Sequence, residues 1–210
     1  MTTSPALGRR DRKKLETRAA LSAAALRLVA ANGLEHVTVE QISEACDVSS
    51  RTFFNYFASK DEALIGGDAE IGQTLDMFRA LPPEIDLVEA LRLAFVPVIL
   101  QMEDHRETIS LRMRVVADNP QLLPRLLATG VESEMAVTAA ISDRLGLAAD
   151  HPFPPVAAAV VGAAFRVALM RWATAARPPT LARLVDEAFD MVASGLSVPS
   201  PSAHPSSKDS

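Results

Sequence analysis

The segment from Thr38 to Phe57, TVEQISEACDVSSRTFFNYF, restricts the folds open to this chain more than any other segment does. Thr38 and Gln41 have the spacing of a capping box, in which each side chain accepts a hydrogen bond from the backbone amide of the other residue. Ser49 is a favourable N-cap for a second helix, which we expect from about Ser50 to Tyr56. Two short helices joined by a tight turn form a helix-turn-helix. Apolar residues recur at helical spacing on the inner face of the first helix, at Val39, Ile42 and Cys46.

The second helix divides its residues between two faces. Phe53 and Phe57 are four residues apart, so we expect both to point into the domain. The other residues include the types that read base edges, since Arg pairs with guanine, Asn with adenine, and Thr or Phe contacts the thymine methyl group. A helix-turn-helix places its second helix in the major groove of DNA. We therefore predict that DNA is bound by Thr38, Ser49, Ser50, Arg51, Thr52, Phe54, Asn55, Tyr56 and Lys60.

A further helix start follows directly after this motif. Ser59 and Glu62 have the capping-box spacing, so we expect a helix to begin at Lys60 and to continue to about Arg79. Free amides and a cation at a helix start attract phosphate. We expect Thr38 and Lys60 to contact the DNA backbone, with Lys60 contributing to binding regardless of sequence.

Residues 18–64 resemble the TetR family of bacterial transcriptional regulators. The resemblance rests on Ala31-Asn32-Gly33, Val37-Thr38-Val39, Ile42, Ala45, Val48-Ser49, Thr52, Tyr56-Phe57, Ser59-Lys60 and Leu64. The chain departs from the family pattern at Asp47, Arg51, Phe54 and Asn55, where glycine, glycine, tyrosine and histidine are usual. The resemblance implies a homodimer that represses transcription at a palindromic operator and responds to a ligand.

The composition indicates an all-α protein with about nine helices. Hydrophobic residues make up 49% of the 210 residues and aromatic residues only 5%, and Ala, Leu and Val dominate. Proline falls mostly between the periodic stretches or at their starts. We expect a three-helix DNA-binding head at residues 9–64 and a larger helical body for ligand binding and dimerisation at 65–196. Residues 1–8 and the Pro/Ser-rich residues 197–210 are expected to be disordered.

Charge is distributed unevenly between these two parts. Residues 1–60 hold nine Lys or Arg against six Asp or Glu, a balance of +3, whereas residues 61–210 hold twelve against twenty, a balance of −8. A basic head suits a polyanion and an acidic body does not. The N-terminus shows no signal peptide pattern, and the most apolar stretch, Val156 to Phe165, is cut by Arg166 before it reaches membrane-spanning length. We therefore expect a cytoplasmic protein with no membrane partner.

The last two expected helices, the eighth at about 156–176 and the ninth at about 181–196, are apolar on more than one side. In the family that the sequence resembles, the last two helices pair with their copies to form the dimer interface. Small residues would allow a close approach between copies. The predicted interface residues are Ala159, Gly162, Ala163, Arg166, Met170, Ala173, Leu184, Ala188 and Val192.

The body is expected to enclose a pocket for a small apolar or amphipathic molecule. The predicted lining residues are Met102, Arg112, Met113, Phe165, Leu169 and Trp172. The alternative is a DNA-binding regulator without a small-molecule effector, controlled by a partner protein or by its expression level. A cavity in the body would favour the first hypothesis, and solid packing would favour the second.

An enzyme is not expected. The four histidines, His36, His105, His151 and His204, show no metal-ligand spacing, and the chain lacks a nucleophile motif and a phosphate-binding loop. We predict no catalytic residues, no metal and no cofactor. The single cysteine, Cys46, rules out an internal disulfide and is expected to be a buried apolar residue.

Overall fold

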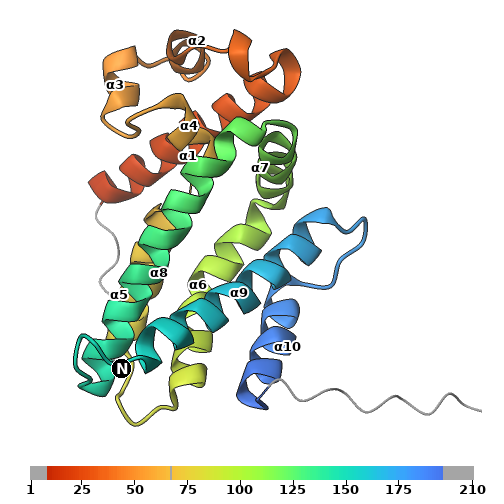
Figure 1. The fold of residues 1–210 in the computed structure, drawn as a ribbon. Helices are drawn as coiled ribbons and strands as arrows, with labels where there is room; N and C mark the ends of the chain where they lie inside the picture. The colour runs from red at the N-terminus through yellow and green to blue at the C-terminus, as the bar shows by residue number, and fades with distance from the viewer. Residues whose placement is uncertain (1–8, 67, 196–210) are drawn as a thin grey trace, which may run out of the picture.

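The computed structural model describes residues 9–66 and 68–195, and within them it contains helices and no strands (Figure 1). The prediction of an all-α fold is therefore confirmed, and these described residues form ten α-helices rather than about nine. The expected disordered tails, 1–8 and 197–210, lie outside the described residues. The α-helices are α1 (Arg9–Asn32), α2 (Val39–Glu44), α3 (Ser50–Phe54), α4 (Lys60–Ile65), α5 (Asp68–Ala80), α6 (Leu87–Asp104), α7 (Arg106–Asp118), α8 (Leu123–Leu145), α9 (Phe153–Thr174) and α10 (Leu181–Ala193), and the short 3-10 helices are η1 (Leu34–His36) and η2 (Pro120–Leu122).

The extra helix comes from a break at Gly66. The sequence predicts one helix from Lys60 to about Arg79, but Gly66 ends α4 with φ 66° and ψ −165°, a conformation that side chains with a Cβ rarely adopt. A Cβ added at Gly66 would also lie 2.9 Å from Cζ of Arg112. Glycine thus allows the sharp break and leaves room for the guanidinium of Arg112 beside it.

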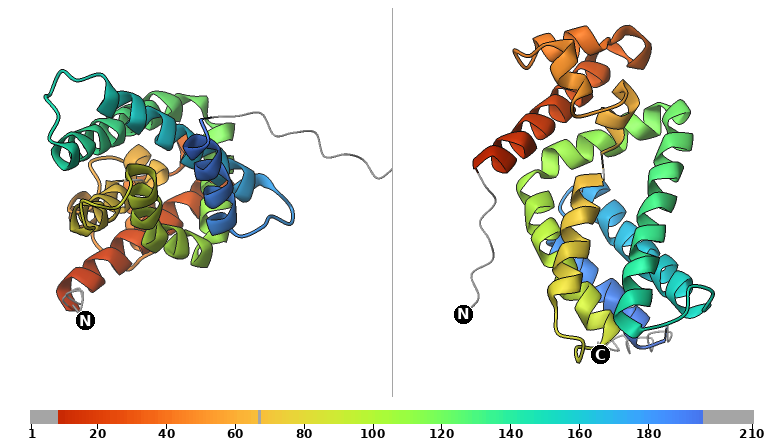
Figure 2. Two further views of the ribbon diagram at one scale, coloured as in Figure 1. Left: turned by 90° about the horizontal axis from the view of Figure 1, so that it is seen from below. Right: turned by 90° about the vertical axis from the view of Figure 1, so that its left-hand side faces the viewer.

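The head consists of α1 to α4 and forms one end of the molecule (Figures 1 and 2). Phe53 and Phe57 are 0% and 2% exposed, so their predicted inward orientation is confirmed. Their rings lie 5.5 Å apart, and the guanidinium of Arg18 lies 4.2 Å from the ring centre of Phe57. Burial of these rings against α1 fixes how the two short helices of the motif stand relative to each other.

The helix α7 joins the body to the head. Val115, Val116 and η2 residue Leu122 are buried in the same apolar cluster as the head residues. Nη2 of Arg112 donates to Oγ of Ser22 at 3.1 Å, and Oγ of Ser22 donates to the carbonyl of Ala63 at 2.7 Å. The head is therefore packed and hydrogen-bonded onto the end of α7.

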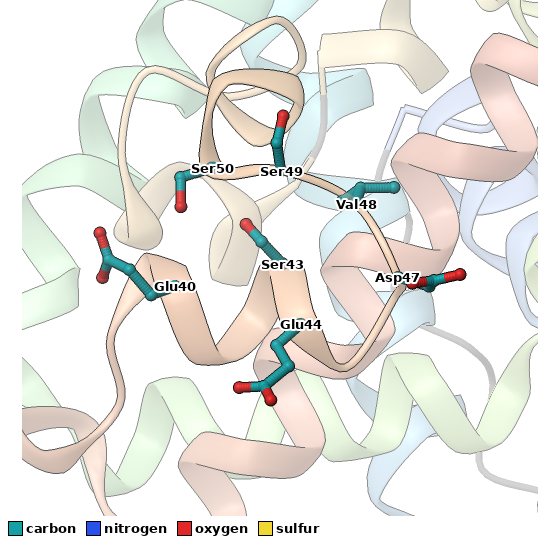
Figure 3. A pocket seen from close by; sticks show the side chains of 7 residues that line it. All are labelled: Glu40, Ser43, Glu44, Asp47, Val48, Ser49 and Ser50. Carbon is teal, nitrogen blue, oxygen red and sulfur yellow. The ribbon is translucent and has the colours of Figure 1, made fainter.

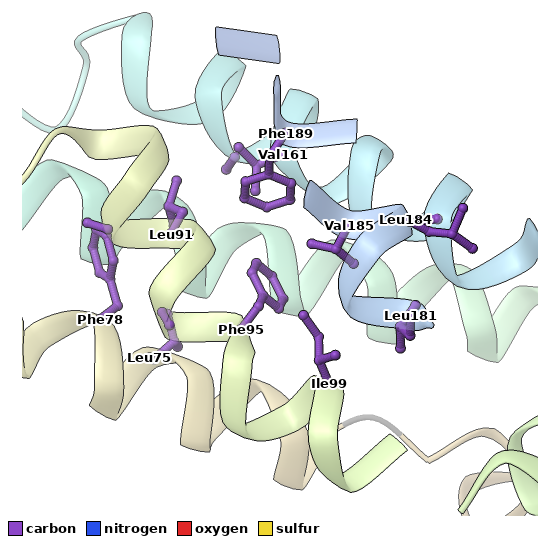
Figure 4. Packing of buried hydrophobic residues seen from close by; sticks show 14 of the residues in the cluster. Leu75, Phe78, Leu91, Phe95, Ile99, Val161, Leu181, Leu184, Val185 and Phe189 are labelled. Atoms are coloured by element: carbon purple, nitrogen blue, oxygen red, sulfur yellow. The ribbon is translucent and has the colours of Figure 1, made fainter. Parts of the chain in front are cut away.

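The body, α5 to α10, has its own core (Figure 4). Phe95 of α6 stacks on Phe165 of α9, with ring centres 4.5 Å apart, and meets Phe189 of α10 edge-on at 5.9 Å. Arg92 of α6 forms ion pairs with α10 through Asp186 at 3.4 Å and Asp190 at 2.6 Å. The hydrogen bond with Asp190 raises the pKa of Arg92 above its ordinary value. These contacts hold α6, α9 and α10 together as one packed unit.

Candidate DNA-binding interface

The first helix of the motif begins as predicted. The amide of Gln41 donates to Oγ1 of Thr38 at 3.3 Å, and the amide of Thr38 donates to Oε1 of Gln41 at 2.9 Å. This reciprocal capping box satisfies two amides that the helix itself leaves free. Thr38 is exposed, so its hydroxyl lies at the surface at the start of α2.

The turn between the helices depends on Asp47. Its φ of 54° places it in the left-handed region, where glycine is the usual residue and Asp is better tolerated than most. The amide of Val48 donates to the carbonyl of Ser43 at 3.0 Å and closes the turn. The aspartate thus takes the turn conformation despite its Cβ.

The second helix, α3, is capped by Ser49. Its Oγ accepts from the amide of Thr52 at 3.1 Å and lies 2.9 Å from Oγ1 of Thr52. The helix is shorter than predicted, since α-helical geometry ends at Phe54, although the following turn continues in the same direction. Thr52 therefore contributes to the cap, and its hydroxyl has a partner within the chain.

The solvent-exposed side chains define the outer face of α3. Arg51, Phe54 and Asn55 are exposed, and 55% of Phe54 is accessible although its ring meets Phe53 edge-on at 5.5 Å. Ser50, the first residue of α3, and Tyr56, two residues after its end, are half-buried. A guanidinium, a carboxamide and an aromatic ring therefore project from one short, capped helix, in a combination suited to reading base edges.

The structure corrects the role expected for Lys60. Its Nζ donates to the carbonyl of Leu34 at 2.6 Å and to that of Val37 at 2.7 Å. The ammonium therefore ties α4 to the segment before α2, and it does not stand free for a phosphate. The capping box predicted at Ser59 forms only in part. The amide of Glu62 donates to Oγ of Ser59 at 3.2 Å, which confirms the cap, but the Glu62 carboxylate accepts from the amide of Ala58 at 2.7 Å and not from that of Ser59.

Replacing Lys60 with Met is expected to destabilise the protein by about 1.5–3 kcal/mol, because two carbonyls lose a charged donor. The salt dependence of DNA binding should change little. Urea unfolding and binding titrations at several salt concentrations measure the two effects, with the exposed Lys13 replaced by Met as the control. Unchanged stability, with a salt slope reduced by about 1 per head, would restore the phosphate role.

Sequence reasoning missed two features of the head. Arg18 of α1 donates through Nη1 to the carbonyl of Tyr56 and so positions the end of the motif from outside it. An open hollow of about 410 Å3 also lies against α2, the turn and the start of α3 (Figure 3). Its lining is acidic and polar, with the residues Glu40, Ser43, Glu44, Asp47, Val48, Ser49 and Ser50.

Cys46 lies half-buried in the turn after α2, against the apolar cluster of the head, and burial raises the pKa of its thiol. A raised pKa keeps the thiol protonated and weakly nucleophilic near neutral pH. Cys46 therefore acts as a small packing residue. Within the described residues, no group of three or more His, Cys, Asp or Glu side chains has the geometry to hold a metal ion.

The predicted ligand residues line neither the hollow of the head nor a smaller hollow of the body, between α6 and α10. Met102, Met113, Phe165 and Leu169 pack against the body core, and Trp172 is only 3% exposed. The guanidinium of Arg112 lies at the joint between head and body instead.

The hollow of the body has a volume of only about 90 Å3, against about 300–1,000 Å3 for typical ligand pockets. It is lined by Arg92, Val96, Ile99, Leu100, Ala182, Val185 and Asp186.

The predicted dimer residues fall into three groups. Ala159, Gly162, Arg166 and Met170 form an exposed row along α9, and Ala163, Ala188 and Val192 are half-buried. Ala173 and Leu184 belong to the chain's own core, at 7% and 2% exposure, so their assignment to an interface is corrected. Figure 4 shows Leu184 in this core.

By length and composition α9 is also apolar enough to cross a membrane, contrary to expectation. It begins earlier than expected, at Phe153, because proline is accommodated in the first turn of a helix. The core helix of a soluble protein passes the same test, and α9 places Ala158, Val161, Ala168 and Trp172 in the body core.

Comparison with known proteins assigns the chain to a family. Residues 21–65 match the family model described as bacterial regulatory proteins, tetR family, and residues 85–197 match the MftR C-terminal domain. The chain is 35% identical over 173 residues to the HTH-type transcriptional regulator TcmR of Streptomyces glaucescens. The aligned region covers 79% of this chain and 76% of TcmR. It is 34% identical over 122 residues to the putative mycofactocin biosynthesis transcriptional regulator MftR of Mycobacterium tuberculosis. This second aligned region covers 56% of this chain and 60% of MftR.

The fold is shared with solved structures of low sequence identity. The crystal structure of Thermus thermophilus FadR, a TetR-family transcriptional repressor in complex with lauroyl-CoA, is 19% identical with a TM-score of 0.53. The match covers 89% of this chain and 98% of that one. The match to both parts of the regulator, together with the capped helix-turn-helix, shows that the chain belongs to the TetR family of bacterial regulatory proteins and is a transcriptional regulator, not an enzyme.

Proposed function

We propose that the chain is a cytoplasmic, homodimeric repressor that binds a near-palindromic operator through α3 of each head. The observation that carries this proposal is the exposure of Arg51, Phe54 and Asn55 on a helix held by a cap and two buried rings. Two-fold symmetry would set the two recognition helices about 34–36 Å apart, or a multiple of that distance, along the DNA. The predicted domain bounds fit this division of labour, with residues 9–64 reading DNA and 65–196 controlling it.

Each side chain of the motif has a role in this proposal. Arg51 pairs with O6 and N7 of a guanine, Asn55 pairs with an adenine, and Phe54 contacts a thymine methyl group. Ser50 lies at the N-terminal end of the helix, where recognition helices contact base edges. The remaining predicted residues, Thr38, Ser49, Thr52 and Tyr56, contact the sugar-phosphate backbone and hold the register.

We place the dimer interface on the exposed row of α9. Ala159 and Gly162 are small, and a Cβ added at Gly162 would meet no atom within 4 Å, so a second helix can approach closely. Met170 adds an apolar side chain that is 48% exposed. Apart from Arg166, the row consists of small and apolar residues, which can pack against their own copies about a two-fold axis.

Replacing Met170 with Asp is expected to weaken the dimer by about tenfold or more, since the two-fold axis brings both copies of the charge into one interface. Sedimentation equilibrium measures the dissociation constant. Met135→Asp is the matched control, because Met135 is 67% exposed on α8 and lies outside the proposed interface. Dissociation by the Met135 change but not by the Met170 change would move the interface to α8.

Control by a small molecule would act through α7. At its start, Nη2 of Arg106 donates to the carbonyls of Trp172 at 3.3 Å and Ala175 at 2.8 Å, and Oγ of Ser110 donates to that of Ala173 at 3.0 Å. At its end, Val115 and Val116 lie in the core of the head. A ligand that displaces the C-terminal end of α9 would therefore displace the head. It can do so only by its differential affinity for the two arrangements.

We propose an apolar or amphipathic effector, which would bind by opening the core around Phe165, Leu169 and Trp172. The lauroyl-CoA bound to the FadR structure supports this class of molecule. The close packing of Phe95 on Phe165 favours the second candidate, a regulator without a small-molecule effector. Titration of amphipathic acids into the protein–DNA complex separates the two, because only the first candidate predicts release of DNA.

A further inference from the structure

The acidic hollow of the head is lined both by Glu40 of α2 and by Ser50, the first residue of the recognition helix α3. Glu40 is exposed in the first turn of α2, and the Thr38–Gln41 capping box fixes the geometry of that turn. Figure 3 shows the Glu40 carboxylate on the same side of the hollow as the hydroxyl of Ser50, the first residue of α3. Glu44 and Asp47 line the same hollow but point away from Ser50 (Figure 3).

This placement puts a negative charge next to the helix that enters the major groove. A carboxylate near the phosphates is repelled, so a negative side chain at this edge lowers affinity for DNA in general. The same group becomes favourable at a base edge that offers a hydrogen-bond donor. Its effect therefore depends on the base that faces it.

Only one base edge in the major groove suits a carboxylate well, because an ionised carboxylate accepts hydrogen bonds and cannot donate them. Guanine presents two acceptors, N7 and O6, and thymine presents the acceptor O4 and a methyl group. Adenine offers N6 as a donor but places the acceptor N7 beside it, whereas cytosine presents the donor N4 without a neighbouring acceptor. Aspartate and glutamate accordingly accept from cytosine N4.

We infer that Glu40 is a specificity-determining residue that accepts a hydrogen bond from N4 of a cytosine, at one position in each half-site next to the base read by Ser50. This inference rests on the proposed operator binding and adds a reading residue outside α3. The carboxylate selects by rejection as much as by attraction, because guanine and thymine present only acceptors or a methyl group to it, and adenine places the acceptor N7 beside its donor N6.

A purely structural role for Glu40 makes a different prediction. An acidic side chain in the first turn of α2 also interacts favourably with the helix dipole. In that role its removal would lower the stability of the head slightly and leave the choice of base unchanged. Base preference is therefore the readout that separates the two roles.

The test compares the full-length protein with Glu40→Ala, and with Glu44→Ala as the matched control on the next turn of α2. Sequences bound from a random DNA pool locate the cytosine position, and titrations then use operators with C·G or T·A at that position. The wild type and Glu44→Ala should prefer C·G by about tenfold or more, and Glu40→Ala should show less than about a twofold preference.

Two results would overturn the inference. One is a Glu40→Ala protein that keeps the wild-type preference. The other is binding by Glu40→Ala that rises by the same factor on C·G, T·A and unrelated DNA, which would show that Glu40 acts only by repulsion. A wild-type protein that selects no sequence would instead overturn the operator-binding proposal itself, so the two failures are distinguishable.

Discussion

Replacing Arg51 with Ala is expected to remove most of the protein's preference for its operator over other DNA. Arg51 is exposed in the first turn of α3 and is the only Arg or Lys in this helix. Loss of a bidentate contact with guanine costs about 1–3 kcal/mol of discrimination, and a dimer loses the contact in both half-sites. The expected loss is therefore about 2–6 kcal/mol in the ratio of specific to non-specific binding.

The measurement is a pair of titrations, one with the selected operator and one with unrelated DNA of the same length. Arg27→Ala is the control, because Arg27 is also exposed in the head but lies on α1, outside the motif. The control removes the same charge and should weaken both titrations alike. Equal effects of the two substitutions, with no change in preference, would show that Arg51 contributes only charge.

Replacing Phe53 with Ala is expected to destabilise the protein by about 3–5 kcal/mol. Phe53 is fully buried, and its ring contacts those of Phe54 and Phe57 at 5.5 Å. The cavity left behind would separate α3 from the rest of the head. Urea unfolding followed by circular dichroism measures the loss.

The neighbouring residue provides the control for this prediction. Phe54 is 55% exposed, so Phe54→Ala should change stability by less than about 1 kcal/mol while weakening operator binding. The two substitutions therefore separate packing from recognition within one short helix. A large loss of stability from Phe54→Ala and a small one from Phe53→Ala would mean that α3 is rotated about its axis, with Phe54 facing the core and Phe53 facing solvent.

Local features of the fold could be predicted from the sequence, because the residues that determine them lie three or four positions apart. The caps at Thr38, Ser49 and Ser59, and the inward orientation of Phe53 and Phe57, are examples that the structure confirms. Each depends on hydrogen bonds or periodicity within a single helix. The resemblance to the TetR family covers the same local segment.

Features that depend on distant residues could not be predicted in this way. Lys60 meets the carbonyls of Leu34 and Val37, more than twenty positions away, and nothing in the local sequence indicates those partners. Leu184 and Met170 are both apolar residues on apolar helices, yet one is 2% exposed and the other 48%, because packing of α10 on α6 and α9 decides which faces are covered.

The pocket is the least predictable part for the same reason. The size and sequence position of Phe165 and Trp172 indicate residues that line a pocket, but large apolar residues are equally suited to filling a hydrophobic core. The structure places Phe165 against Phe95 and Trp172 beneath Arg106, with 5.6 Å from the guanidinium carbon to the ring centre. Which of these contacts opens for a ligand depends on the energy of a second arrangement, and no sequence pattern encodes that energy.

Selection of bound sequences from a random DNA pool, followed by titration of the selected site at several salt concentrations, tests the central claim most directly. The account predicts a near-palindromic site with half-sites about one helical turn or a multiple of it apart, bound by two chains with a steep salt dependence. Weak binding without a preferred sequence, at any salt concentration, would contradict it.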